Sequence, residues 1–224
     1  MHNELVFIAH TLLVGCGALV ATRLGQCALV AYISLQAVLA NLLVTKQTTL
    51  FGLDATCSDA YIIGAVLSLN LLQEYYGKKS TQSAIWASFA LLFFYTIAGQ
   101  IHLWYSPALS DTMHDFYAAI LTPMPRLAIA SLITYLIVQH LDAWLYGLLK
   151  ARWHTQHLLV RNYTSISITQ LVDTILFSFL GLYGIVSNIL HVVIISYAIK
   201  LLAMAIITPC LAFAHSILGR SHEV

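Results

Sequence analysis

Seven long apolar segments dominate this sequence and constrain its fold more than any other feature. Each is long enough to cross a bilayer as a helix, which takes about 20 mostly apolar residues. Only 8% of the residues are charged, whereas soluble domains carry about 25%, so most of the surface must face lipid. The expected spans are residues 4–22, 27–46, 56–76, 81–104, 126–149, 165–185 and 189–218.

These segments predict an all-α fold, a polytopic transmembrane helix bundle that forms one domain over residues 1–224. A transmembrane β-barrel is a poor alternative, because its strands read as ~10-residue segments of alternating polarity, and nothing here alternates. An alternative with six spans places residues 4–22 on the membrane surface. The segment is uniformly apolar, whereas a surface helix has one strongly polar face, so we expect it to span.

Basic residues are distributed unevenly between the expected connections. Cytoplasmic loops of membrane proteins carry an excess of Lys and Arg. If the N-terminus lies outside and seven helices alternate, the inner side receives most of the basic residues, with Lys200 inside the last span. We therefore predict a cytoplasmic C-terminus. The inner residues are Arg23, Lys78, Lys79, Lys150, Arg152, Arg161 and Arg220, and the outer ones are Lys46 and Arg126.

Amides and carboxylates recur inside the spans in a Q-x-x-D pattern. Gln139 and Asp142 lie in the span 126–149, and Gln170 and Asp173 lie in the span 165–185. Side chains three residues apart share one face of a helix. The span 56–76 ends with a related group, Asn70, Gln73 and Glu74. Ionisable residues in membrane helices usually face the bundle interior or a water-filled cavity.

The expected depth of these residues indicates a shared polar chamber. Counted at about 1.5 Å per residue from the expected inner helix ends, Asp142 and Asp173 lie roughly 10–12 Å above the inner boundary. Asn70 has a comparable depth, and Glu74 is closer to the cytosol. The alternative is that these groups only join helices, at about 0.6 kcal/mol per hydrogen bond. The matching depth favours a chamber lined by the third, fifth and sixth helices.

A second polar layer is expected nearer the outer surface, and Lys200 is expected to have a carboxylate partner, because an unpaired ammonium inside a membrane is expensive. This outer layer comprises Asn41, Asp59, Gln100, His102 and Arg126.

Other functional classes find little support in the sequence. There is no C-x-x-C, H-E-x-x-H, G-x-S-x-G or G-x-x-x-x-G-K-[ST] motif, so no metal, cofactor or built-in ATPase is predicted. No basic run indicates nucleic acid binding. Two rivals to a transporter remain. One is an intramembrane aspartyl hydrolase in which two aspartates share a proton, and the other is a structural or assembly subunit without a ligand.

Four blocks of the sequence resemble the queuosine precursor transporters, also called the vitamin uptake transporter family. They are "LANLLVTKQTTLFGL", "NLLQEYYGKKSTQSAIWASF", "PRLAIASLITYLIVQHLDAWLYGLLK" and "TSISITQLVDTILFSFLGLYG", followed by Tyr197 and Lys200. Many members of the family read D-x-x-N-E-x-Y-G where this chain has Asn70 and Gln73. The segment 4–22 resembles an addition to a six-helix family core.

The resemblance implies import of 7-deazaguanine bases, such as queuine or its smaller precursors, through the inner (cytoplasmic) membrane. It implies no enzymatic activity and no cofactor. A homodimer or a separate energising partner is compatible with it, and transport could be facilitated, proton-coupled or driven by an external ATPase. The expected substrate-binding residues are Asn41, Asn70, Gln73, Glu74, Arg126, Gln139, Asp142, Gln170, Asp173 and Lys200.

Overall fold

The structure is a computed structural model that describes residues 2–152 and 158–202. Its helices are α1 (His2–Arg23), α2 (Gln26–Leu43), α3 (Asp59–His102), α4 (His114–Leu121), α5 (Met124–Arg152) and α6 (Leu158–Phe177). A short π-helix, η2 (Ser178–Leu182), extends α6. A further helix, Ile189–Leu202, is called here the last helix. The expected span 189–218 lies outside the described residues beyond Leu202.

Four helical stretches of the described chain are long and apolar enough to cross a membrane. They are α1, α2, α3 and the stretch His114–Leu141, which includes most of α5. Large apolar side chains such as Leu12 and Leu13 on α1 are 64% and 71% exposed, as expected for a surface in contact with lipid. The chain is therefore a multi-pass membrane protein, while the seven spans and their orientation stay predictions.

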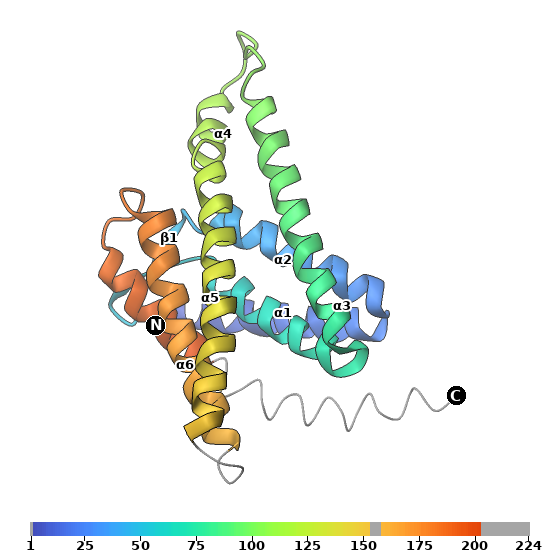
Figure 1. Cartoon of the computed structure of the whole chain (residues 1–224). Helices are drawn as coiled ribbons and strands as arrows, with labels where there is room; N and C mark the ends of the chain where they lie inside the picture. The colour runs from blue at the N-terminus through green and yellow to red at the C-terminus, as the bar shows by residue number, and fades with distance from the viewer. Residues whose placement is uncertain (1, 153–157, 203–224) are drawn as a thin grey trace.

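α3 consists of two helices that meet at Gly77, as the separate spans 56–76 and 81–104 predicted. Gly77 has φ 80° and ψ 169°, a conformation that glycine adopts without the steric cost of a Cβ atom. The second part of α3 then runs back along the molecule toward the loop that precedes α4 (Figure 1). The helix α4 within the connection 105–125 was not expected from the sequence.

The connection between α2 and α3 forms an antiparallel β-hairpin, which corrects the prediction of a purely helical fold. Its strands are β1 (Gln47–Leu50) and β2 (Leu53–Thr56), with Leu50 opposite Leu53. Phe51 and Gly52 form the turn with φ values of 52° and 81°, and positive φ at both positions is typical of a type I′ hairpin turn. Each strand has four residues, too few for sequence alternation to be recognised.

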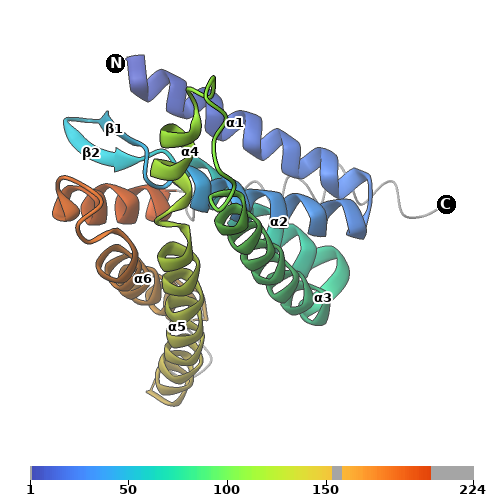
Figure 2. The same cartoon turned by 90° about the horizontal axis from the view of Figure 1, so that it is seen from above.

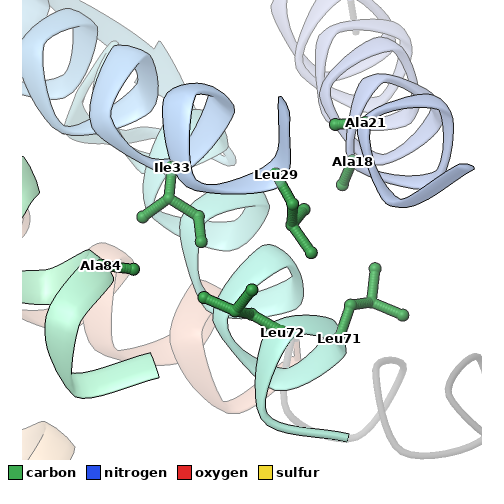
Figure 3. Packing of buried hydrophobic residues seen from close by; sticks show 7 residues of the cluster. All are labelled: Ala18, Ala21, Leu29, Ile33, Leu71, Leu72 and Ala84. Atoms are coloured by element: carbon green, nitrogen blue, oxygen red, sulfur yellow. The ribbon is translucent and has the colours of Figure 1, made fainter. Parts of the chain in front are cut away.

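The helices pack in two groups. α2 packs most extensively against α3, with α1 beside them, while α5 packs against α6. Figure 2 shows α1, α2 and α3 together on one side, α5 and α6 on the other, and the hairpin beside the last helix. Small residues let membrane helices approach closely, and the first group uses several of them (Figure 3). Its core comprises Ala18, Ala21, Leu29, Ile33, Leu71, Leu72 and Ala84.

Two smaller apolar clusters connect the groups around the last helix. One joins α2, α5, η2 and the last helix through Val44, Leu127, Leu182 and Val192. The other places Leu50 and Ala55 of the hairpin against Ile195 and Ile199. The last helix is thus held between the hairpin and the π-helix, and this position decides which polar side chains meet.

Gly64 should be a position at which even one added methyl group destabilises the protein. A Cβ atom there would lie 2.0 Å from Val14 Cγ1 and 2.7 Å from Gln36 Nε2, so Gly64→Ala must push α1 away from α3. We expect a loss of about 1–3 kcal/mol, measured as a lower Tm of the purified protein. Gly15→Ala is the matched control, because its nearest neighbour would lie at 3.8 Å. An equal effect of both changes would contradict this packing.

The predicted orientation can be tested with a reporter phosphatase that is active only outside the cytosol. Fusions after Ser110 should be active, because the acidic connection that holds Asp111 and Asp115 is expected outside. Fusions after Lys79 or Lys150 should be inactive, because basic loops stay in the cytosol. The reverse pattern would show that the topology is opposite to the predicted one. Activity of the fusions at both Ser110 and Lys150 would show that the span expected between these two residues does not cross the membrane.

Candidate functional site

An ion pair between α6 and the last helix is the main polar contact inside the helix bundle. Lys200 Nζ lies 2.5 Å from Asp173 Oδ2 and donates a second hydrogen bond to Thr174 Oγ1 at 3.1 Å. The two charged side chains are 11% and 28% exposed, respectively. The expected carboxylate partner of Lys200 is therefore confirmed, and Asp173 is compensated by a full positive charge.

A second carboxylate lies close to this pair. Asp59, the first residue of α3, is 2% exposed. It accepts a hydrogen bond of 3.0 Å from Ser196 Oγ, one helical turn before Lys200 on the last helix. Thr56 and Ser58, directly before Asp59, are bonded to each other through their hydroxyls at 2.8 Å. The end of the hairpin thus brings hydroxyl and carboxylate groups close to Lys200 on the last helix.

Asp59 and Lys200 line one small cavity of about 30 Å³. A cavity needs about 10–15 Å³ to hold one water molecule, whereas pockets for small-molecule ligands measure about 300–1,000 Å³. The cavity therefore has room for water and none for a purine-sized base, so this structure is closed around its polar centre. The other lining residues are Val44, Thr56, Ser58, Ile62, Thr174, Phe177, Ser178, Leu182, Val192 and Ser196.

Local helix geometry explains how the hydroxyls of this cavity come together. Thr174 and Ser178 are four residues apart, as are Ser196 and Lys200, so each pair shares a helix face. Ser178 is also the first residue of the π-helix η2. Single-turn π-helices are rare and frequently occur at functional sites, and here the π-helix contributes Ser178 and Leu182 to the cavity wall.

α6 begins at Leu158, seven residues before the expected start of its span at residue 165. Asp173 therefore lies 15 residues after the start of α6, about 22 Å along the axis at 1.5 Å per residue, and its depth in the membrane stays a prediction. Lys200, the partner of Asp173, lines the same cavity as Asp59, which was expected in the outer layer. Asn70 lies 11 residues further along α3, about 16 Å from Asp59.

Two other candidate residues connect helices, and a third bonds within its own helix. Asn41 on α2 accepts a hydrogen bond of 3.2 Å from Ser131 Oγ on α5. Arg126 Nε donates to the carbonyl oxygen of Leu180 in η2 at 2.8 Å. Gln139 Nε2 donates to Tyr135 Oη at 2.8 Å within α5. The first two contacts tie α5 to its neighbours, and none of the three candidates lines the cavity.

The remaining candidates are not brought together with the ion pair. Gln73 and Glu74 are exposed just before the break at Gly77, and Asn70 and Gln170 are half-buried. The side chain of Asp142 lies outside the described part of the chain. The predicted chamber between the third, fifth and sixth helices therefore stays a prediction. Within the described residues, no group of three His, Cys, Asp or Glu side chains is arranged to hold a metal ion.

An aromatic cluster accompanies Gln139 at the contact between α3 and α5. The ring of Tyr135 lies 5.2 Å from that of Phe89 and 6.5 Å from that of Trp86, measured between centroids. The Trp86 contact is edge-to-face, a geometry that aromatic pairs favour. This cluster joins the second half of α3 to α5 and leaves the Trp86 ring 49% exposed.

The list of candidate residues drawn from the sequence contains Lys200 but omitted the six other polar members of the cavity. Asp59 was assigned to the outer layer and not to the binding site. The other five are Thr56, Ser58, Thr174, Ser178 and Ser196. The four-residue spacings Gln170–Thr174–Ser178 and Ser196–Lys200 were visible in the sequence and mark polar helix faces. The contribution of Asp59 was not visible, because it depends on how the hairpin places the start of α3.

The pairing of Asp173 with Lys200 can be tested by a double-mutant cycle. Lys200→Met alone leaves the Asp173 carboxylate partly buried without its cation, which should cost about 3 kcal/mol of stability. Adding Asp173→Asn should recover much of that loss, because both charges are then gone. The measurement is the Tm of the purified single and double variants. Additive losses would show that the two side chains do not interact.

Comparison with known proteins shows the family to which this chain belongs. A family described as "Putative vitamin uptake transporter" matches residues 60–214, a range that holds every candidate residue except Asn41. A protein of Bacillus subtilis (strain 168), named "Probable queuosine precursor transporter", is 33% identical over 189 residues, which cover 83% of this chain and 82% of the relative. No solved structure matches the chain. The chain therefore belongs to the vitamin uptake transporter family, and it is a multi-pass membrane transporter and not an enzyme.

Proposed function

We propose that this protein carries queuosine precursors, which are 7-deazaguanine bases such as queuine or its smaller precursors, across the inner membrane into the cell. The name of the Bacillus subtilis relative supports this substrate class. The observation that carries the proposal is the partly buried pair of Asp173 and Lys200 beside a cavity rich in hydroxyl groups. A charged pair inside a membrane protein usually marks a substrate or ion pathway.

The chemistry of the pair fits the edge of a guanine-like base. Such an edge presents adjacent N–H donors and a carbonyl acceptor. The Asp173 carboxylate is an acceptor with two oxygens, and the Lys200 ammonium is a donor with three hydrogens. A base that inserts beside them replaces their mutual contact with charge-assisted hydrogen bonds, which are stronger than neutral ones. Thr174 and Ser196 add hydroxyls, which can donate or accept.

Transport requires the closed cavity to open, because about 30 Å³ does not admit a base. The two packing groups, α1–α3 and α5–α6, are natural rigid units for alternating access by rocking. In this proposal the half-buried and exposed candidates line the opened path toward the cytosol, and Asn41 and Arg126 hold the outer end of α5. The cytosolic set comprises Asn70, Gln73, Glu74, Gln139, Asp142 and Gln170.

A structural or assembly subunit is the second candidate function, and one observation favours it. Asn41 bonds to Ser131, Arg126 to Leu180 and Lys200 to Asp173, so these side chains already satisfy one another as helix connectors would. The two functions differ in what a neutral replacement changes. In a connector, the replacement alters stability and abundance, while in a carrier it abolishes uptake by protein that still reaches the membrane.

The decisive test is uptake of labelled queuine and its two smaller deazaguanine precursors by cells that lack their own route. We expect wild-type protein to restore uptake of at least one base. Asp173→Asn should lower this uptake by about ten-fold or more, because it removes a charged hydrogen-bond acceptor worth about 1.5–3 kcal/mol. Uptake is normalised to the amount of protein in the membrane.

The matched control is Asp115→Asn, which makes the same change at an exposed position in the first turn of α4. It should leave uptake unchanged. Normal uptake by correctly inserted Asp173→Asn protein would show that Asp173 does not take part in substrate binding or transport. If wild-type protein imports none of the three bases, the substrate class is wrong, and the subunit function becomes the better account of the ion pair.

A further inference from the structure

The charges around the cavity do not balance. Lys200 is the one Lys or Arg side chain among the lining residues, and it is held by Asp173 and Thr174. Asp59 is 2% exposed and bonded to the neutral hydroxyl of Ser196. Within residues 2–152 and 158–202, no Lys or Arg nitrogen lies within 4.0 Å of the Asp59 carboxylate. The two carboxylates near the cavity therefore have only one ammonium between them, and it is paired with Asp173.

The other groups packed around Asp59 do not supply the missing positive charge. Val44 directly after α2, Thr174 of α6 and Ser178 of η2 line the cavity, and all three are neutral. Burial raises the pKa of the neighbouring Cys57 thiol, which keeps it uncharged. His191 Nδ1 on the last helix lies 3.5 Å from Asp54 Oδ2 on the hairpin, so this imidazole pairs with Asp54.

The start of α3 compensates only part of the Asp59 charge. A helix N-terminus carries about half an elementary positive charge, which offsets only part of a full negative charge. The cost of removing a carboxylate from water exceeds this stabilisation even after the protein relaxes. A buried carboxylate without a full countercharge therefore becomes neutral by taking up a proton.

We propose that Asp59 is a proton-binding site, and that the carrier takes up one proton from solution at this carboxylate when it closes into the state described here. The cavity beside Asp59 has room for water, which can hydrogen-bond to the carboxyl group. Once the cavity opens, water solvates the carboxylate, and the proton returns to solution. The consequence for transport rests on the proposed function: closure around a substrate then becomes less favourable as the pH rises.

The proton site can be tested without any substrate by measuring Tm against pH for the full-length protein in lipid nanodiscs. A group that is protonated in the folded state adds stability at low pH, and this stability is lost as the pH rises. Asp59→Asn is permanently neutral and has no such proton to lose. We expect the Tm of wild-type protein to fall, relative to Asp59→Asn, by about 3–5 °C between pH 5 and pH 8.

Asp115→Asn is the control and should follow the wild-type curve, because its carboxylate is exposed. Ser196→Ala provides a second variant if Asp59→Asn fails to insert. It removes the hydrogen bond that stabilises the ionised carboxylate, so the decline should move to higher pH by about one unit. Parallel curves for wild-type and Asp59→Asn proteins, or an unmoved decline in Ser196→Ala, would overturn the proposal.

Replacing Na⁺ by choline at pH 8 distinguishes a proton from a metal cation. Stabilisation by Na⁺ that is lost in Asp59→Asn would assign the site to sodium and overturn the proton assignment. Because no base is added, the result is independent of the uptake assay. A proton site without uptake would reject the proposed substrate, and uptake with parallel Tm curves would reject the proton site.

Discussion

The cost of placing charge in a membrane is the constraint on which this structure depends. Lys200 would be prohibitively unstable alone among apolar helices, and Asp173 meets it from α6 at 2.5 Å. The contact requires the last helix to lie beside α6 with Lys200 facing Asp173. The apolar clusters around the last helix provide that position, so packing and electrostatics select the same arrangement.

Close packing on the other side of the molecule makes this arrangement rigid. Without a hydrophobic difference between side chains and lipid, membrane helices associate through tight contact of small residues. Gly64 and Ala18 provide such contacts among α1, α2 and α3. The hairpin follows α2 in the chain and precedes Asp59, the first residue of α3. A carboxylate at the start of α3 is thereby delivered to the cavity beside Lys200.

Much of the fold followed from apolar length alone, and the exceptions have physical causes. The helices on both sides of Gly77 were predicted because a lipid-facing helix needs an uninterrupted apolar run. The β-hairpin was missed because its strands are too short to show a period, and α4 was missed because eight residues in an acidic connection carry no span-length signal. The first turns of α6 were missed because polar residues such as Arg161 and Asn162 interrupt the apolar run there.

The sequence by itself determined that the chain is a helical membrane protein, that it belongs to a transporter family, and that Lys200 needs a carboxylate. These conclusions depend on composition, spacing and the cost of charge in lipid, which are local properties. Only the tertiary structure decided that the carboxylate is Asp173, and that Asp59 and Ser196 share the cavity with Lys200. Asp173 and Lys200 are 27 residues apart in sequence, and Asp59 and Ser196 are 137 residues apart. Helix packing, which no local pattern encodes, brings each pair together.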